Sequence, residues 1–176
     1  MDIAATFIQR SRYYLATEYP TKIRRCLDAL PEGALWRRSD HDSNSIGNLL
    51  LHLRGNVEQW IVSSVGGMPD QRHRRGEFDA REGASANSLF GALVQTIQEA
   101  DVVIAGLTPE RLGERRTIQG REMTVMEAVF HVVEHFALHT GQVILLTKAY
   151  VPDSIQFYED AGGLATPRWP TEGGRL

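Results

Sequence analysis

Three histidines recur at every fourth position in residues 131–142, which read HVVEHFALHTGQ. His135 and His139 stand four residues apart, so on a helix their imidazoles project from one face and can chelate a single metal ion. His131 continues the same column, but three rings on one straight helix span about 12 Å, which one ion does not easily bridge. A reactive zinc-type site uses three protein ligands and leaves one position open. The spacing therefore predicts a divalent-metal site that requires a ligand from another part of the chain.

His52 is the candidate for that ligand. It lies on a second predicted helix, about 100° from the centre of an apolar stripe, beside Asn56. On the later helix, His135 and His139 fall at the inner edge of the apolar stripe, whereas His131 points towards solvent or a neighbouring loop. If the two helices are neighbours, His52 completes a site with His135 and His139. Taken alone, each of these histidines is more often a hydrogen-bonded structural residue at a helix edge than a metal ligand.

Two other positions are candidates for supporting roles at such a site. Asn56 follows His52 by one helical turn and is placed to orient a bound group or a ligand imidazole. His131 is a candidate for a supporting group or a surface residue. His41 and His73 lie in predicted loops, and we expect both to be solvated.

The basic stretch of residues 71–81, QRHRRGEFDAR, has two interpretations. It contains Glu77 and Asp79 and a single aromatic residue, Phe78. The composition favours a solvated loop. The alternative is that its arginines receive an anionic substrate.

Composition restricts the class of protein. The chain has 176 residues, a net charge of −3 and 42% hydrophobic residues, which predicts a single soluble globular domain over residues 1–176 and argues against nucleic-acid binding. No apolar run approaches the roughly 20 residues that cross a membrane, and the first residues do not form a secretory signal. Cys26 is the only cysteine, which excludes an internal disulfide and fits a reducing compartment. We expect a cytoplasmic protein in which Cys26 is a buried small residue.

The apolar periodicity predicts four long helices with short connections. The Thr124–Glu127 pair fits a capping box, which marks the start of the last helix. A short hairpin is expected around Gly120, and a short fifth helix or an extended tail after Asp153. These features predict an all-α four-helix bundle with its core in residues 3–150 and a tail in 151–176. The helices are expected at residues 3–30, from within 42–45 to 65, from about 85 to 105, and 124–150.

Residues 45–60, SIGNLLLHLRGNVEQW, and 131–146, HVVEHFALHTGQVILL, together resemble the DinB-like superfamily, also called the YfiT-like metal-dependent hydrolases. The RRGEF element at 74–78 resembles one branch of it. The resemblance covers about residues 3–150. It implies an up-down-down-up four-helix bundle, commonly a homodimer, with nickel or zinc held by His52, His135 and His139. Thr140 replaces an arginine found in many members. Gly141 fits a close helix–helix contact, and Gln142 is expected to anchor the neighbouring helix.

The resemblance implies a function as well. Some DinB-like proteins are S-transferases that use a low-molecular-weight thiol, and a metal ion lowers the pKa of a bound thiol or water. We therefore expect a metal-dependent S-transferase or hydrolase that acts on a small molecule. The alternatives are a non-catalytic metal-binding or stress-response protein, and a dimerisation module without metal. No cysteine lies near the histidines, which favours an open site over a closed structural zinc site.

Overall fold

The computed structural model describes residues 2–169. Four long helical segments dominate it, and shorter helices and two strand pairs lie in the connections. The long segments are α1 (Ile3–Tyr13) with η1 (Tyr14–Glu18) and α2 (Tyr19–Ala29), α3 (Ile46–Val57) with η3 (Glu58–Ser63), α5 (Ala86–Ala105), and α7 (Val125–Tyr150). The shorter elements are η2 (Ala34–Trp36), α4 (Arg74–Asp79), α6 (Pro109–Leu112), β1 (Arg115–Ile118), β2 (Arg121–Thr124), β3 (Tyr158–Ala161) and β4 (Leu164–Pro167).

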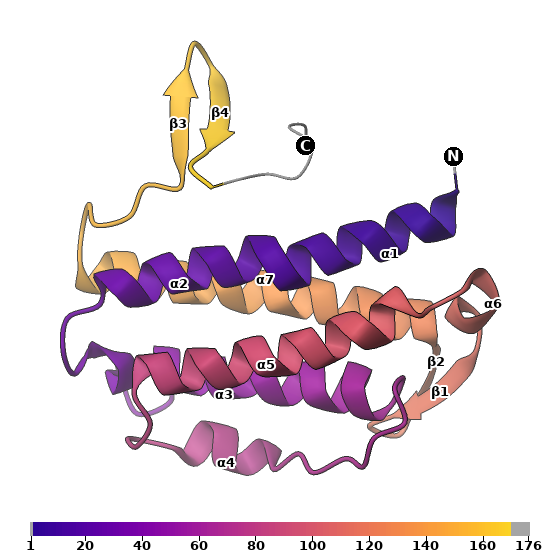
Figure 1. Cartoon of the computed structure of the whole chain (residues 1–176). Helices are drawn as coiled ribbons and strands as arrows, with labels where there is room; N and C mark the ends of the chain where they lie inside the picture. The colour runs from indigo at the N-terminus through magenta and orange to yellow at the C-terminus, as the bar shows by residue number, and fades with distance from the viewer. Residues whose placement is uncertain (1, 170–176) are drawn as a thin grey trace.

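The long segments form a four-helix bundle. Segment α1–α2 and helix α7 run in one direction, and α3 and α5 run in the other (Figure 1). Helix α3 contacts both α5 and α7, and the connection from α3 to α5 carries the small helix α4 across α3. The predicted all-α, up-down-down-up bundle is confirmed, and α3 and α7, which carry the candidate histidines, are antiparallel neighbours.

Side-chain caps fix the starts of these helices, as the sequence predicts. The Ser45 hydroxyl accepts a hydrogen bond from the backbone N–H of Asn48, and the Thr124 hydroxyl accepts one from Glu127. Each pair is reciprocal, so it satisfies two backbone donors that a helix start otherwise leaves unpaired. The predicted hairpin is present as the antiparallel β1–β2 pair, with Gly120 at a φ of 76° in its turn.

The two π-helical segments are not predicted by the apolar periodicity. Segment η1 directly precedes α2, whose first turn contains Pro20. Proline has no backbone N–H, so a helix that continues through it must lose a hydrogen bond, and a wider turn accommodates that loss. Segment η3 extends α3 and carries Gln59 and Trp60 to the end of the bundle where the β1–β2 hairpin lies.

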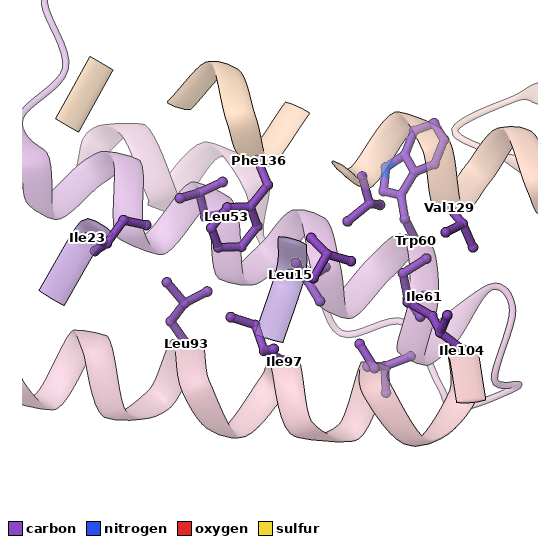
Figure 2. Packing of buried hydrophobic residues seen from close by; sticks show 14 of the residues in the cluster. Leu15, Ile23, Leu53, Trp60, Ile61, Leu93, Ile97, Ile104, Val129 and Phe136 are labelled. Carbon is purple, nitrogen blue, oxygen red and sulfur yellow. The ribbon is translucent and has the colours of Figure 1, made fainter. Parts of the chain in front are cut away.

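The core fills the space between the four helices. Figure 2 shows Leu53 of α3, Leu93 of α5 and Phe136 of α7 meeting at its centre, and all three are 0% exposed. On α7, Val125, Val129, Val132 and Val143 are also buried, whereas Val133 is partly exposed. By length and a mean hydropathy of 1.2 alone, α7 would also pass as a membrane span, a property that core helices of bundles share.

The C-terminal segment differs from one of the expectations. No helix follows Asp153 within the described residues, and β3 and β4 form a hairpin instead (Figure 1). Its two-residue turn is Gly162–Gly163, with φ values of 66° and 86°. Two adjacent residues at positive φ match the twist of a β-hairpin, and glycine adopts that backbone without a steric penalty. The Gly-Gly pair was the sequence signal for this turn.

Candidate metal centre

The three predicted ligands meet. The Nε2 atom of His52 on α3 lies 3.0 Å from Nε2 of His135 on α7. The Nε2 atom of His139 lies 3.2 Å from the same His135 atom. One ligating nitrogen from each ring falls within 4.8 Å of the other two. Antiparallel packing of α3 against α7 therefore brings an imidazole from the first half of the chain to a chelating pair in the second half.

A buried carboxylate orients His52. Its Nδ1–H donates to Oε2 of Glu77 at 2.7 Å, and the carboxylate also accepts from Arg72 Nε at 2.7 Å and Arg72 Nη2 at 2.9 Å. Arg72 Nη2 lies 3.1 Å from His52 Nδ1 as well. We place the proton on Nδ1 because the contact with the ionised carboxylate is shorter and needs a donor. That tautomer leaves a lone pair on Nε2, directed at the cluster.

His139 is oriented in the same way by its own helix. Its Nδ1–H donates to Oε1 of Gln142 at 2.7 Å, so its Nε2 also carries a lone pair. The Nδ1 atom of His135 is buried and has no partner among residues 2–169. Two lone pairs therefore face the third nitrogen across 3.0 and 3.2 Å, and one proton on His135 cannot satisfy both fully. A cation that accepts three nitrogen lone pairs fits this arrangement.

The charge states of the cluster suit metal binding. Burial lowers the pKa of His135 to about 3, and the neighbouring His139 and His52 add to the effect. Burial also lowers the pKa of His139. Burial opposes ionisation of Glu77, but its hydrogen bonds from Arg72 and His52 prevail, and the pKa of Glu77 is lowered. Near neutral pH, His135 and His139 are thus neutral imidazoles, the form that binds metals, close to the ionised Glu77.

The prediction of a solvated loop at residues 71–81 is wrong for the residues that contact the site. Residues 74–79 form helix α4, Glu77 is 8% exposed, and the Arg72 side chain is only 2% exposed. Gly55 of α3 makes room for them, since a Cβ there would overlap the Glu77 carboxylate. A charged residue is buried only where it has a partner. One partner of Glu77 is His52, 25 positions earlier in the chain, so local sequence did not indicate that Glu77 is buried. The available signal was Gly55, three residues after a candidate ligand.

A chain of hydrogen bonds connects the Arg72–Glu77 pair behind His52 to the β1–β2 hairpin. Arg72 Nη1 donates to Oε1 of Gln59 in η3 at 3.0 Å. Gln119 Nε2, in the hairpin turn, donates to the same oxygen at 2.8 Å. The hairpin turn, η3 and the arginine behind Glu77 therefore share one polar network.

A cavity of about 510 Å³ opens beside the histidines. Its walls come from α3, η3, α4, the β1–β2 hairpin and α7, so it lies where these elements meet. His52 and His135 face it, and other wall residues are Asn56, Trp60, Arg74 and Arg121. Two of the three histidines therefore border the cavity, which leaves room for a further ligand from solution.

The structure separates the remaining histidines from the ligand group. His131 packs its ring on Trp60, with the ring centroids 3.9 Å apart, and lines the cavity instead of pointing into solvent. It is not one of the three nitrogens that converge. His41 and His73 are exposed, as predicted.

Two expectations for the segment after His139 are wrong for contacts within the chain. Gly141 is exposed and a Cβ there would meet nothing within 4 Å, so it makes no close helix–helix contact among the described residues. Gln142 accepts from His139 on the same helix and does not anchor a neighbouring one. The spacing of three residues explains this, because it places Gln142 on the same side of α7 as His139.

Comparison with known proteins identifies the family. Residues 2–158 match the family model described as "Protein of unknown function (DUF1572)". The chain belongs to this family. DUF1572 is a DinB-like family, so the resemblance seen in the sequence is confirmed.

A solved structure shows the same fold as this DUF1572 protein. The crystal structure of a DinB-like protein from Bacillus cereus ATCC 10987 superposes with a TM-score of 0.63 at 17% sequence identity. The similarity covers 81% of this chain and 89% of that chain. At that identity it establishes the bundle alone. No curated protein matches the DUF1572 chain.

Proposed function

We propose that this DUF1572 protein is a metal-dependent enzyme, an S-transferase or a hydrolase, with nickel or zinc on His52, His135 and His139. The observation that carries the proposal is the convergence of the three Nε2 atoms, with the rings of His52 and His135 lining a cavity. Structural zinc sites are closed by four protein ligands, often cysteines. Within residues 2–169, no cysteine, carboxylate or further histidine joins the three. An open three-ligand set supports reactivity over a purely structural role.

The residues around the cavity have roles that follow from their contacts. A divalent ion at this site supplies Lewis acidity, which lowers the pKa of a thiol or a water that binds to it. Glu77 keeps the His52 ring and tautomer fixed. Asn56, one turn after His52, faces the cavity and is placed to orient the bound group. Trp60 and His131, whose ring centroids lie 3.9 Å apart, form a wall that shields that group from water.

The substrates expected for this protein follow from its resemblance to DinB-like proteins. We expect a small molecule, with a low-molecular-weight thiol as the second substrate in the transferase case. The size of the cavity suits a small molecule and not a macromolecule. A single reduced thiol, Cys26, buried in the core, is compatible with the proposed cytoplasmic location.

We also propose that the protein is a homodimer that uses the outward face of α7. Large apolar side chains are exposed along this helix: Met126, Phe130, Leu138 and Leu145 are 44%, 61%, 58% and 68% exposed. They fall at intervals of three to four residues or multiples of these, so they share one face. Gly141, open on the same face, would let a second helix approach closely.

Metal analysis tests the proposed function. Protein purified without a histidine tag is expected to carry about one equivalent of zinc or nickel, measured by mass spectrometry of the elements. His135→Ala is expected to carry none, because it removes the nitrogen that the other two face. His41→Ala, in an exposed loop, is the control and should keep its metal. Wild-type protein that stays metal-free after both metals are supplied would leave only the dimerisation module.

Activity is tested on the metal-loaded protein. A set of low-molecular-weight thiols is combined with electrophilic acceptors, and a set of activated esters and amides tests hydrolysis. Turnover that disappears in His135→Ala is the expected result. Stoichiometric metal without turnover and without thiol binding would instead support the non-catalytic metal-binding protein.

A further inference from the structure

Two arginines in the cavity wall have no anionic partner among residues 2–169. The guanidinium carbon of Arg74 on α4 lies 5.0 Å from the centroid of the Phe78 ring, and its side chain has no hydrogen bond or ion pair among the described residues. The backbone of Arg121 belongs to the β1–β2 ladder, but its side chain makes no hydrogen bond or ion pair within the described part of the chain. Both side chains line the cavity that contains His52 and His135.

Two neighbouring arginines, in contrast, have partners. The guanidinium group of Arg72 donates hydrogen bonds to Glu77 and Gln59. Arg75, adjacent to Arg74 on α4, pairs with Asp79 at 3.2 Å and does not line the cavity. Arg74 and Arg121 therefore stand apart in presenting an unpaired guanidinium to the cavity.

The residues that line the cavity include one carboxylate, Glu127, which already accepts hydrogen bonds from Thr124. Glu127 Oε2 accepts hydrogen bonds from the backbone N–H of Thr124 at 2.6 Å and from its hydroxyl at 2.8 Å. It caps helix α7 and does not pair with Arg74 or Arg121. The wall as a whole is positively charged and attracts anions.

Asn56 adds a second, independent indication of a ligand. It is 4% exposed, it lines the cavity, and its side-chain amide has no hydrogen-bond partner among residues 2–169. Buried polar atoms are nearly always paired, so an unpaired amide facing a cavity indicates a partner from solution. Trp60 and Met123 supply apolar surface on the same wall.

We infer that the cavity binds a small organic anion, with its charged group held between Arg74 and Arg121 and a hydrogen-bonding group at Asn56. Guanidinium groups pair with carboxylate, phosphate and sulfonate through two parallel hydrogen bonds, which gives geometric specificity as well as charge. A cavity of about 510 Å³ suits a molecule of this size. The inference adds a substrate class to the proposed function. Anion binding itself does not depend on the metal site, because the two arginines do not contact the ligand histidines; only the reaction of the bound anion rests on the proposed function.

Isothermal titration tests the inference with matched aromatic probes. Benzoate, phenyl phosphate and benzenesulfonate carry a negative charge, and benzamide is the neutral counterpart of benzoate. The titrations use wild type, Arg74→Gln, Arg121→Gln and the control Arg75→Gln, each with and without metal. At least one anion is expected to bind the wild type, and benzamide is not. Each of Arg74→Gln and Arg121→Gln should weaken that binding about tenfold or more, since each removes one charge-assisted pair. Arg75→Gln should leave it unchanged.

The outcomes separate this inference from the metal-enzyme proposal. Anion binding that is unaffected by both cavity substitutions, or that occurs only through added metal, overturns the inference and leaves the metal site intact. Failure of all three anions to bind either form also overturns it. Arginine-dependent binding to a protein that takes up no metal supports the inference and overturns the metal enzyme. Metal content of the Arg74→Gln and Arg121→Gln variants should equal that of wild type.

Discussion

The Nδ1 atom of His52 on α3 donates a hydrogen bond to Oε2 of Glu77 on α4 at 2.7 Å. This contact fixes the His52 tautomer and directs Nε2 at His135. It also explains why α4 packs on α3, because the carboxylate is buried with Arg72 as its counter-ion. The geometry of the candidate metal site and the fold of residues 71–81 therefore depend on each other.

Glu77→Gln is predicted to weaken metal binding by about 10- to 100-fold, the usual loss when a carboxylate behind a histidine ligand is removed. Glutamine keeps the size of the side chain but loses the charge that balances Arg72 and holds the His52 tautomer. Competition with a chromophoric chelator measures the dissociation constant. Asp79→Asn on the same helix, where the carboxylate is exposed, is the control. Equal affinities for the two variants would contradict the role of Glu77.

Gly55→Ala is predicted to weaken metal binding about tenfold while the protein stays folded. The added methyl group would displace the Glu77 carboxylate from α3. Gly91→Ala is the control, since it lies in α5 with nothing within 4 Å. It should raise the free energy of unfolding by about 0.5–1 kcal/mol and leave metal affinity unchanged. Thermal unfolding and the chelator competition are measured on both, and an unaltered affinity in Gly55→Ala would count against the packing explanation.

His131→Ala is predicted to keep about one equivalent of metal, whereas His139→Ala loses it. The His131 ring packs on Trp60, and its nitrogens are outside the convergent set. The substitution should alter tryptophan fluorescence because it removes that stacking partner. Loss of metal in His131→Ala would require a different ligand set.

The Cys26 thiol is predicted to be unreactive in the folded protein. Burial raises the pKa of Cys26 to about 11, and the side chain is 0% exposed. At pH 8 only about one thiol in a thousand is then the reactive thiolate, and the reagent cannot reach it without local opening. Ellman's reagent at pH 8 should react quickly with protein unfolded in guanidinium and slowly with native protein. Fast reaction of the native protein would show that this part of the core opens readily.

The proposed homodimer is tested by Leu138→Arg. A charge in the middle of the outward face of α7 should dissociate the dimer, because burying it without a partner is unfavourable. Val102→Arg is the matched control, as Val102 is 74% exposed on α5. Light scattering coupled to size exclusion gives the mass of each variant. A monomeric wild type, or a dimeric Leu138→Arg, would rule out this interface.

Local rules explain the features that the sequence predicts correctly. The helix start within residues 42–45, the capping box at Thr124 and the hairpin around Gly120 depend on residues within a few positions of one another. The same holds for His135 and His139, whose shared face follows from helical periodicity. The hairpin at Gly162–Gly163 also had a local signal, which the expectation of a short helix overlooked.

The sequence by itself determined the four helices, their starts and the chelating pair on α7, because backbone hydrogen bonding and helical periodicity act over short distances. It also supplied His52 as a candidate, through its place at the edge of an apolar stripe. Only the tertiary structure decided that His52 reaches that pair, that Glu77 and Arg72 are buried behind it, and that Arg74 and Arg121 face the same cavity. These features depend on contacts between distant segments. The burial of a charge in particular is favourable only when its partner arrives from another part of the fold.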